Sequence, residues 1–469
     1  MITPLRDQDQ RGESDRGLWT SLEQAVGQDR PITVDLWQSL KGRLDFSQKK
    51  PRRIAGVEVA FQPSSQGEGT YVLKSPVPNS YLKLDARDYF LWEQMDGEHS
   101  IRDLAVAYFT KYGAFPFERL MRLLAQLKAS CLLEEKLLDV FGAATAHFNA
   151  RRLAYRLQRF AETATQKEFS LKNADAFFDA LFKRAGWLFF TRPARFLYAV
   201  LTPAGLALFL WLLLGGAYPL FSSAGSYGLG LLVLMLANYV MIFFHECGHA
   251  LAIKNYGRHV PKAGILLYFG GLAPFVDATD TWMAPKRARI VVSFAGPLAT
   301  ILFGNLMALS IALYSAFSLN PVLFQVAFVC YFGAFMNLLP LLECDGYFVL
   351  MDLLEIPMLR KKALAFLKES VVDKLKARSP FNREEKILAS FGLLSAVSTG
   401  LIVVFAVYMW QSRVMAMLGE LASGRDPLST VLAGGLMILV GAPLVLGLGI
   451  RGLLLAGNLA DRARRMVSP

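Results

Sequence analysis

The chain has 469 residues, of which 54% are hydrophobic and only 19% charged, with a net charge of +12 and four cysteines. Soluble globular chains carry roughly 25% charged residues, so this is not the composition of a purely soluble protein. The many Leu, Phe and Ala residues exclude disorder over most of the chain, and four cysteines exclude a disulfide scaffold. No recognition motif accompanies the basic charge, so we expect no nucleic-acid partner.

The first part of the chain predicts a small cytoplasmic α+β domain. Residues 1–50 are polar, are expected to be partly disordered, and lack the apolar core of a signal peptide. Within residues 51–140, runs rich in Val and Tyr predict strands, and helices follow. The strands are expected at 57–62, 70–75 and 81–85, and the helices at 86–95, 101–111 and 116–133. Ser100 with Asp103 is typical of a helix N-terminal cap. The expected core is Leu84, Phe90, Leu91, Met95, Ile101, Leu104, Leu120, Leu124 and Leu127.

Residues 141–195 predict a helical, basic linker, which is either an amphipathic element on the bilayer surface or a solvated connection. Beyond residue 195 the hydropathy pattern is that of an α-helical polytopic membrane protein. Six apolar runs are long enough to cross a bilayer, at about 196–214, 229–253, 289–315, 322–342, 388–410 and 431–450. Lys and Arg gather in alternate loops, which predicts that both termini are cytoplasmic. We therefore divide this part into a core at 196–355, a basic cytoplasmic loop at 356–387 and C-terminal helices with a basic tail at 388–469.

Residues 263–276 are apolar but too few to cross a membrane, and Gly270, Gly271 and Pro274 interrupt them. This pattern predicts a re-entrant or edge-strand segment. Such backbone is tolerated at membrane depth only where protein or a water-filled cavity surrounds it. We therefore expect a cavity beside the second span.

That second span contains the sequence His245-Glu246-Cys247-Gly248-His249. Positions i and i+4 share one face of a helix, so both imidazoles can bind one metal ion. Glu246 lies beside them as a candidate general base for a metal-bound water. Ionisable groups within a spanning helix are costly and are functional hypotheses by default.

A catalytic zinc site normally has three protein ligands, so one is missing. Carboxylates near apolar segments are Asp277, Asp280, Glu343, Asp345 and Asp352. The alternating topology brings Glu343 and Asp345 to about the depth of the two histidines. Asp277 and Asp280 lie in the intervening loop, and this argument does not exclude them.

The chain resembles the site-2 protease family of intramembrane zinc metalloproteases. The resemblance rests on HECGH at 245–249 and on NLLPLLECDG at 337–346, with Ala295-Gly296-Pro297 as a third similar element. It implies zinc as the cofactor, Asp345 as the third ligand and a role for Asn337 in holding substrate or the developing oxyanion. The family usually has a second Gly after Asp-Gly, where this chain has Tyr347, so the local backbone is expected to differ.

The segment LKLDARDYFLWEQMDGEHSIRDL at 82–104 resembles PqqD-type peptide-recognition domains. This resemblance implies a winged-helix fold that pairs a leader peptide onto a strand edge; a winged helix used only for assembly is the alternative. The whole layout resembles peptide zinc metalloproteases of bacterial export systems. That implies the bacterial inner membrane as its location and a separate periplasmic adaptor of the membrane-fusion type as a partner.

Three further residues are candidates for a role at this site. His259 follows the second motif histidine by ten positions and is expected to face the surface or lipid headgroups. Cys247 and Cys344 adjoin the motif residues, which leaves open an oxidation-sensitive site or simple packing.

The function expected from these features is a zinc-dependent metallopeptidase that cleaves a membrane-associated or exported peptide. His245, His249 and Asp345 would hold the metal, with Glu246 and Asn337 in catalysis. One alternative is a non-hydrolytic subunit of a peptide export system that retains a structural metal site. A metal transporter is a third reading, but it would need further intramembrane carboxylates along a pathway.

Overall fold

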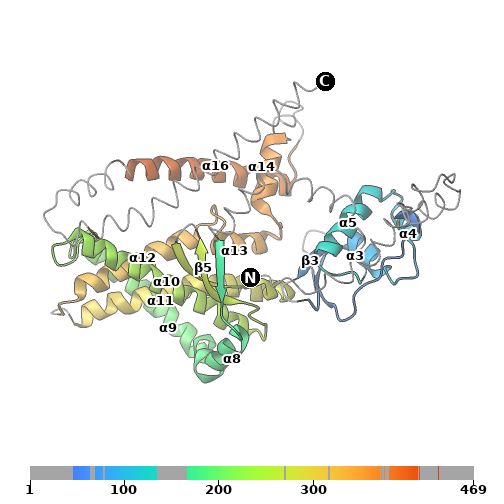
Figure 1. The fold of residues 1–469 in the computed structure, drawn as a ribbon. Coiled ribbons are helices and arrows are strands. Elements are labelled where there is room, and N and C mark those ends of the chain that lie inside the picture. The colour runs from blue at the N-terminus through green and yellow to red at the C-terminus, as the bar shows by residue number, and fades with distance from the viewer. Residues whose placement is uncertain are drawn as a thin grey trace, which may run out of the picture. The chain divides into compact units, whose positions relative to one another are not determined.

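The structure of the protein is a computed structural model. This structure describes residues 46–134 and 166–409, apart from short gaps at 64–68, 78–79, 269–270, 315–316, 370, 372–373 and 375–379. It also describes residues 411 and 431. The chain forms two compact units, one within residues 1–138 and one made mainly of residues 139–469. Figure 1 shows the small unit in blue and cyan and the larger one in green to orange.

The smaller unit is an antiparallel three-stranded sheet followed by three helices. The strands, in the order β1-β2-β3, are Glu58–Gln62, Thr70–Lys74 and Tyr81–Asp85. The helices are α3 Ala86–Glu93, α4 Ile101–Tyr112 and α5 Phe117–Ala129. Ser100 and Asp103 form the expected capping box of α4. Eight of the nine expected core residues are buried in one cluster, and Phe90 packs against it partly buried.

In the larger unit, five helices of the described part are long and apolar enough to cross a membrane. They are α9 Arg192–Leu214, α10 Tyr227–Asn255, α11 Lys286–Leu313, α12 Asn320–Leu338 and α16 Arg383–Met409. They match the first five expected spans, which makes this a multi-pass membrane protein. The sixth expected span, 431–450, lies outside the described residues except for residue 431.

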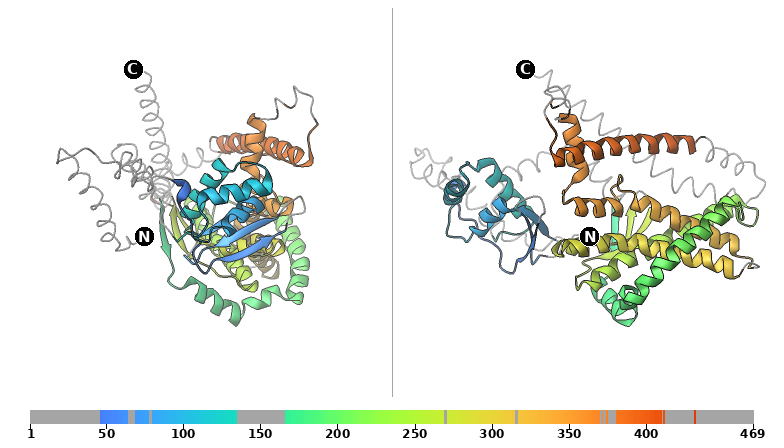
Figure 2. Two further views of the ribbon diagram at one scale, coloured as in Figure 1. Left: turned by 90° about the vertical axis from the view of Figure 1, so that its right-hand side faces the viewer. Right: turned by 180° about the vertical axis from the view of Figure 1, so that it is seen from behind.

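Helix α11 is central to the membrane part, because it packs against α9, α10, α12 and α13 (Figure 2). Phe209 of α9, Ala308 of α11 and Phe324 of α12 share one buried apolar cluster. The fourth span ends at Leu338, earlier than expected, and a short turn leads into α13, Asp345–Leu354. Helix α14, Leu359–Glu369, packs against α16.

A second three-stranded sheet lies beside α10. Its order is β4-β5-β6, with β4 Gln166–Ser170, β5 Ala263–Tyr268 and β6 Gly271–Val276, all antiparallel. The segment 263–276 is thus a hairpin with β6 at one edge. The expected helical linker is wrong at residues 166–170, because these form β4 along the other edge of the hairpin. Helix α8, Ala174–Arg184, and the short 3-10 helix η2, Gly186–Phe190, then lead into α9.

Candidate metal centre

The structure brings together the three residues expected to hold a metal. Nε2 of His245 and Nε2 of His249, one turn apart on α10, lie 2.9 and 3.4 Å from the two carboxylate oxygens of Asp345. The two Nε2 atoms are 3.1 Å apart. One ligand atom from each residue lies within 4.8 Å of the others, and both histidines are buried. Three N and O donors that converge in this way suit a zinc ion with one position left for water.

Helix α11 orients both imidazoles, although it contributes no ligand. Nδ1 of His249 donates to the carbonyl oxygen of Val292 at 2.7 Å. Nδ1 of His245 lies 3.2 Å from the hydroxyl of Thr300, which itself donates to the carbonyl oxygen of Gly296. Because that hydroxyl has only one hydrogen, it accepts from Nδ1 of His245. Both Nδ1 atoms therefore carry the proton, and both Nε2 lone pairs face Asp345.

Two glycines let α10 and α11 approach closely at this point. A Cβ atom on Gly248 would lie 2.6 Å from the carbonyl oxygen of Ala295. A Cβ atom on Gly296 would lie 2.3 Å from Nε2 of His249 and 2.7 Å from Nε2 of His245. Gly296 thus leaves open the space between the imidazoles in which an ion would sit.

Asp345 reaches the histidines because the chain turns back after α12. It is the first residue of α13, where the helix dipole favours a negative charge. Gly346 permits the turn, since a Cβ atom there would lie 2.2 Å from the carbonyl oxygen of Leu338. Tyr347, which replaces the second Gly of the family pattern, is buried, and its hydroxyl accepts from the backbone N–H of Arg360. Tyr347 thus attaches α13 to the start of α14, and the carboxylate of Asp345 lies beside both histidines.

Glu246 lies between the metal centre and the hairpin sheet. Its Oε2 accepts the backbone N–H of Val276, at the end of β6, at 2.8 Å. The group of converging ligand atoms does not include an oxygen of Glu246.

The other carboxylates weighed from the sequence are engaged elsewhere. Among the residues that the structure describes, none of them joins the two histidines. They lie as follows: Asp280 with Arg258, Asp277 with Thr279, Asp352 with Arg289, and Glu343 with Arg360. The choice of Asp345, which spacing alone left open, therefore has a geometric basis.

Asn337 lies near the end of α12, and its amide donates to the carbonyl oxygen of Gly333 in the same helix at 3.1 Å. It lines a cavity of about 440 Å³ between α10 and α12, together with Asn238, Met241, Phe332 and Met336. This position neither brings Asn337 into the ligand group nor tests its expected contact with substrate.

None of the remaining candidates belongs to the group of converging ligand atoms. His259 is exposed, as expected, and its Nδ1 lies 3.2 Å from Asp175. Cys247 packs against a buried apolar cluster, and Cys344 immediately precedes α13. The sequence reasoning overlooked Val292 and Thr300, whose partners lie on a different helix. The only sequence signal near them is the small-residue element Ala295-Gly296-Pro297.

Comparisons with known proteins agree with this centre. The chain is 27% identical over 137 residues to the protein named "Putative peptide zinc metalloprotease protein YydH" of Bacillus subtilis, covering 29% of this chain and 53% of that protein. It is 27% identical over 165 residues to "Zinc metalloprotease MJ0392" of Methanocaldococcus jannaschii, covering 35% of this chain and 43% of that one. The chain thus spans about half the length of the curated relatives it matches. No protein-family profile and no solved structure matches it. These two similarities confirm the resemblance to zinc metalloproteases that the HECGH motif predicts.

Proposed function

We propose that the protein is a zinc-dependent intramembrane metallopeptidase of the site-2 protease type, acting on a membrane-associated or exported peptide. The observation that carries the proposal is the convergence of His245, His249 and Asp345, with Glu246 beside them, within a group of membrane-spanning helices. The names of the two relatives support zinc and peptide hydrolysis. We propose cytoplasmic termini, as the distribution of basic loops predicts, and a location in the bacterial inner membrane, as the resemblance to peptide zinc metalloproteases of export systems implies.

In this mechanism the ligands are the two Nε2 atoms and the carboxylate of Asp345. A bound zinc ion would polarise the scissile carbonyl and bring the pKa of its water toward neutrality. Glu246 would accept the proton of the attacking water and later deliver it to the leaving amine. Its Oε2 is held by the N–H of Val276, so its orientation is set by β6 and not by the ligands.

The edge of β6 is the proposed binding site for an extended substrate. Val276 directs its N–H to Glu246, away from β5. Pro274 and Leu272, two and four residues earlier, therefore also direct their polar groups outward. Proline has no N–H, and the N–H of Val276 is occupied. Leu272 is then the one outward donor that β6 can offer to a substrate strand, beside the outward carbonyl groups.

Leu272→Pro therefore tests the edge sharply. It removes the outward donor while the hydrogen bonds between β5 and β6 remain, and proline is tolerated on a sheet edge. We expect unchanged zinc content with cleavage strongly reduced, and near wild-type cleavage for the control Leu272→Ala. Full cleavage by Leu272→Pro would discard the edge as the substrate site.

The experiment that tests the central proposal combines zinc analysis with peptide cleavage, for wild type and Glu246→Gln in liposomes. Peptides encoded near this protein are the candidate substrates. We expect one zinc in both proteins and cleavage by wild type alone, because the ligands persist while the base is lost. Zinc binding by both with equal cleavage would remove Glu246 from the mechanism. Zinc binding with no cleavage by either would favour the non-hydrolytic export subunit.

We also propose that the smaller unit recruits the peptide as a PqqD-like winged-helix domain. Its support is the arrangement of a three-stranded sheet, whose outer strands β1 and β3 each have one edge without a strand partner in the described residues, followed by three helices. A periplasmic adaptor of the membrane-fusion type remains a proposed partner. Binding of a candidate leader peptide to wild type and to Val59→Ala, but not to Val59→Pro on the outer edge of β1, is the result expected.

A further inference from the structure

The segment between β4 and the first span has one face that packs on the catalytic helix. Ala174 and Phe178 of α8 share a buried cluster with Ala250 and Ile253 of α10. Gly186 of η2 is also buried against α10, since a Cβ atom there would lie 2.7 Å from Leu251. This face of α8 and η2 is therefore buried by contacts with α10.

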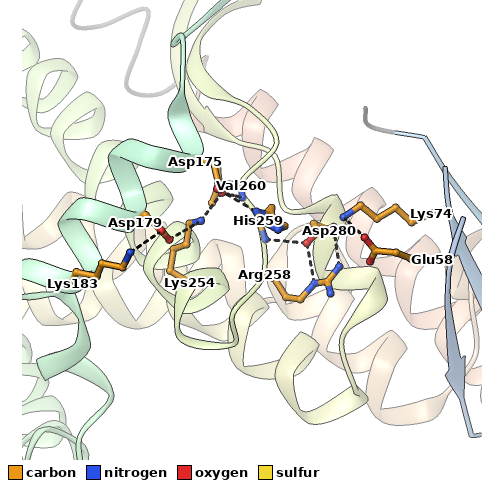
Figure 3. A network of polar contacts seen from close by, with 10 residues as sticks. All are labelled: Glu58, Lys74, Asp175, Asp179, Lys183, Lys254, Arg258, His259, Val260 and Asp280. Carbon is orange, nitrogen blue, oxygen red and sulfur yellow. Dashed lines mark hydrogen bonds and ion pairs between the residues drawn. The ribbon is translucent and has the colours of Figure 1, made fainter. Parts of the chain in front are cut away.

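A second face of α8 carries charge. Asp175 and Asp179 both pair with Lys254 near the end of α10, the latter at 3.0 Å (Figure 3). The Lys254 side chain is only 4% exposed, so this pairing is sheltered from water on the lysine side. Asp175 also accepts the backbone N–H of Val260 at 2.7 Å. These contacts hold α8 to the helix that carries the two metal-ligating histidines.

The remaining face is apolar and exposed. Its members are Phe177 and Leu181 of α8 and Trp187, Leu188 and Phe189 of η2, which are 37–56% exposed. Phe177 and Leu181 are four residues apart, so they share one side of the helix. Five large apolar side chains at this exposure, within thirteen residues, form an apolar patch, and its exposure to water is unfavourable.

The position of this surface along the chain indicates what covers it. Thr191 caps α9 immediately after η2, and the hydroxyl of Tyr198 on α9 donates to the carbonyl oxygen of Phe189 at 3.1 Å. The apolar surface is thus attached to the end of a helix that is long and apolar enough to cross a bilayer. The cations at the same end are Lys183, Arg184, Arg192 and Arg195. Aromatic side chains next to cations at the end of a span are typical of the membrane–water interface.

We propose that α8 and η2 form an interfacial anchor, whose side chains Phe177, Leu181, Trp187, Leu188 and Phe189 insert among the lipids at headgroup depth. The anchor also carries β4, which pairs with β5 of the hairpin sheet. Its immersion therefore fixes the depth of β6 and of the metal centre relative to the bilayer. The anchor is independent of the proposed peptidase activity and holds whether or not the protein cleaves peptides.

Quenching of tryptophan fluorescence by brominated lipids tests this in the full chain reconstituted into liposomes. The emission of Trp187 is taken as the difference between wild type and Trp187→Phe. We expect it to be lost with lipids brominated near the headgroup, and to be lost less with lipids brominated near the chain ends. The matched control is Trp92→Phe, because Trp92 is buried in the smaller unit, and its emission should respond to neither lipid.

Three outcomes would overturn the proposal. Stronger quenching by the deep bromines would place Trp187 in the hydrocarbon core. Quenching by aqueous iodide but by neither lipid would place the surface in water. Quenching by none of the three would mean that protein covers it, either a second copy or another chain. A protein that retains its thermal unfolding temperature in the Trp187→Phe form confirms that the difference reports on a folded molecule.

Discussion

Gly296 is the position at which the smallest change should prevent metal binding. The methyl group of Gly296→Ala would lie 2.3 Å from Nε2 of His249 and 2.7 Å from Nε2 of His245. Zinc–nitrogen bonds are about 2.0–2.1 Å long, so the methyl carbon would take the place of the ion. Metal sites tolerate errors of about 0.2 Å in ligand distance, whereas a relaxed contact between nonbonded atoms needs about 3.5 Å.

The two helices have little room to separate in response. Gly248 lies against the backbone of Ala295, and both imidazoles are hydrogen-bonded to α11, so movement by about 1 Å would break the contacts that orient the ligands. We therefore expect zinc to bind Gly296→Ala at least about 100-fold more weakly, which corresponds to about 2.8 kcal/mol at 1.4 kcal/mol per tenfold.

Competition titration against a zinc-binding dye in detergent measures this affinity, and metal analysis of the purified protein measures occupancy. The matched control is Gly400→Ala on α16, where no atom of the described residues lies within 4 Å of the added methyl group and helix propensity is what changes. Affinity for zinc within tenfold of wild type in Gly296→Ala would refute the assignment of the metal position.

Three further variants separate the parts of the site. Thr300→Val should weaken zinc binding by about 10–100-fold, because the hydroxyl no longer accepts from His245, while Thr300→Ser retains it; equal affinities in the same titration would contradict this. Asn337→Ala should keep zinc and lower kcat/KM by about 10²-fold if the amide serves the oxyanion; unchanged cleavage would end that role. Lys254→Met should lower stability by about 1–2 kcal/mol, measured by thermal unfolding, since two half-exposed carboxylates lose their partner. Burial raises the pKa of Asp175, but hydrogen bonds from Lys254, Val260 and His259 outweigh it and hold that pKa below its ordinary value. The stabilisation from the ionised Asp175 is therefore present above the ordinary pKa of about 3.9 and is lost as the pH falls below it. Acidification should lower the stability of Lys254→Met less than that of wild type.

The features that the sequence predicted well are those encoded locally. Hydrophobic runs identified the first five spans to within a few residues, and the spacing of His245 and His249 already placed both on one helical face. The capping box at Ser100 is equally local. In each case the signal and the structure that it specifies lie within one or two helical turns.

The features that were missed depend on partners far along the chain. Residues 166–170 carry no strand pattern of their own, and they become β4 because β5, almost 100 residues later, offers an edge for pairing. Topology leaves Asp277, Asp280 and Glu343 as candidates beside Asp345 until their cationic and hydroxyl partners are known. Sequence spacing holds no information about those partners, so the third ligand was assigned by resemblance and not from the residues alone.

Helix α11 shows why a search for ligand types describes only part of a metal centre. It contributes no ligand, yet it supplies the two acceptors that set the tautomers of His245 and His249, and the absent side chain of Gly296 that leaves room for an ion. Substrate contact is proposed for a different element, β6. Variants in α11 should therefore change zinc affinity first, whereas variants of the β6 edge should change cleavage at full zinc occupancy. If both sets changed the same quantity, the centre would be one packed unit in which metal binding and substrate binding are not separable.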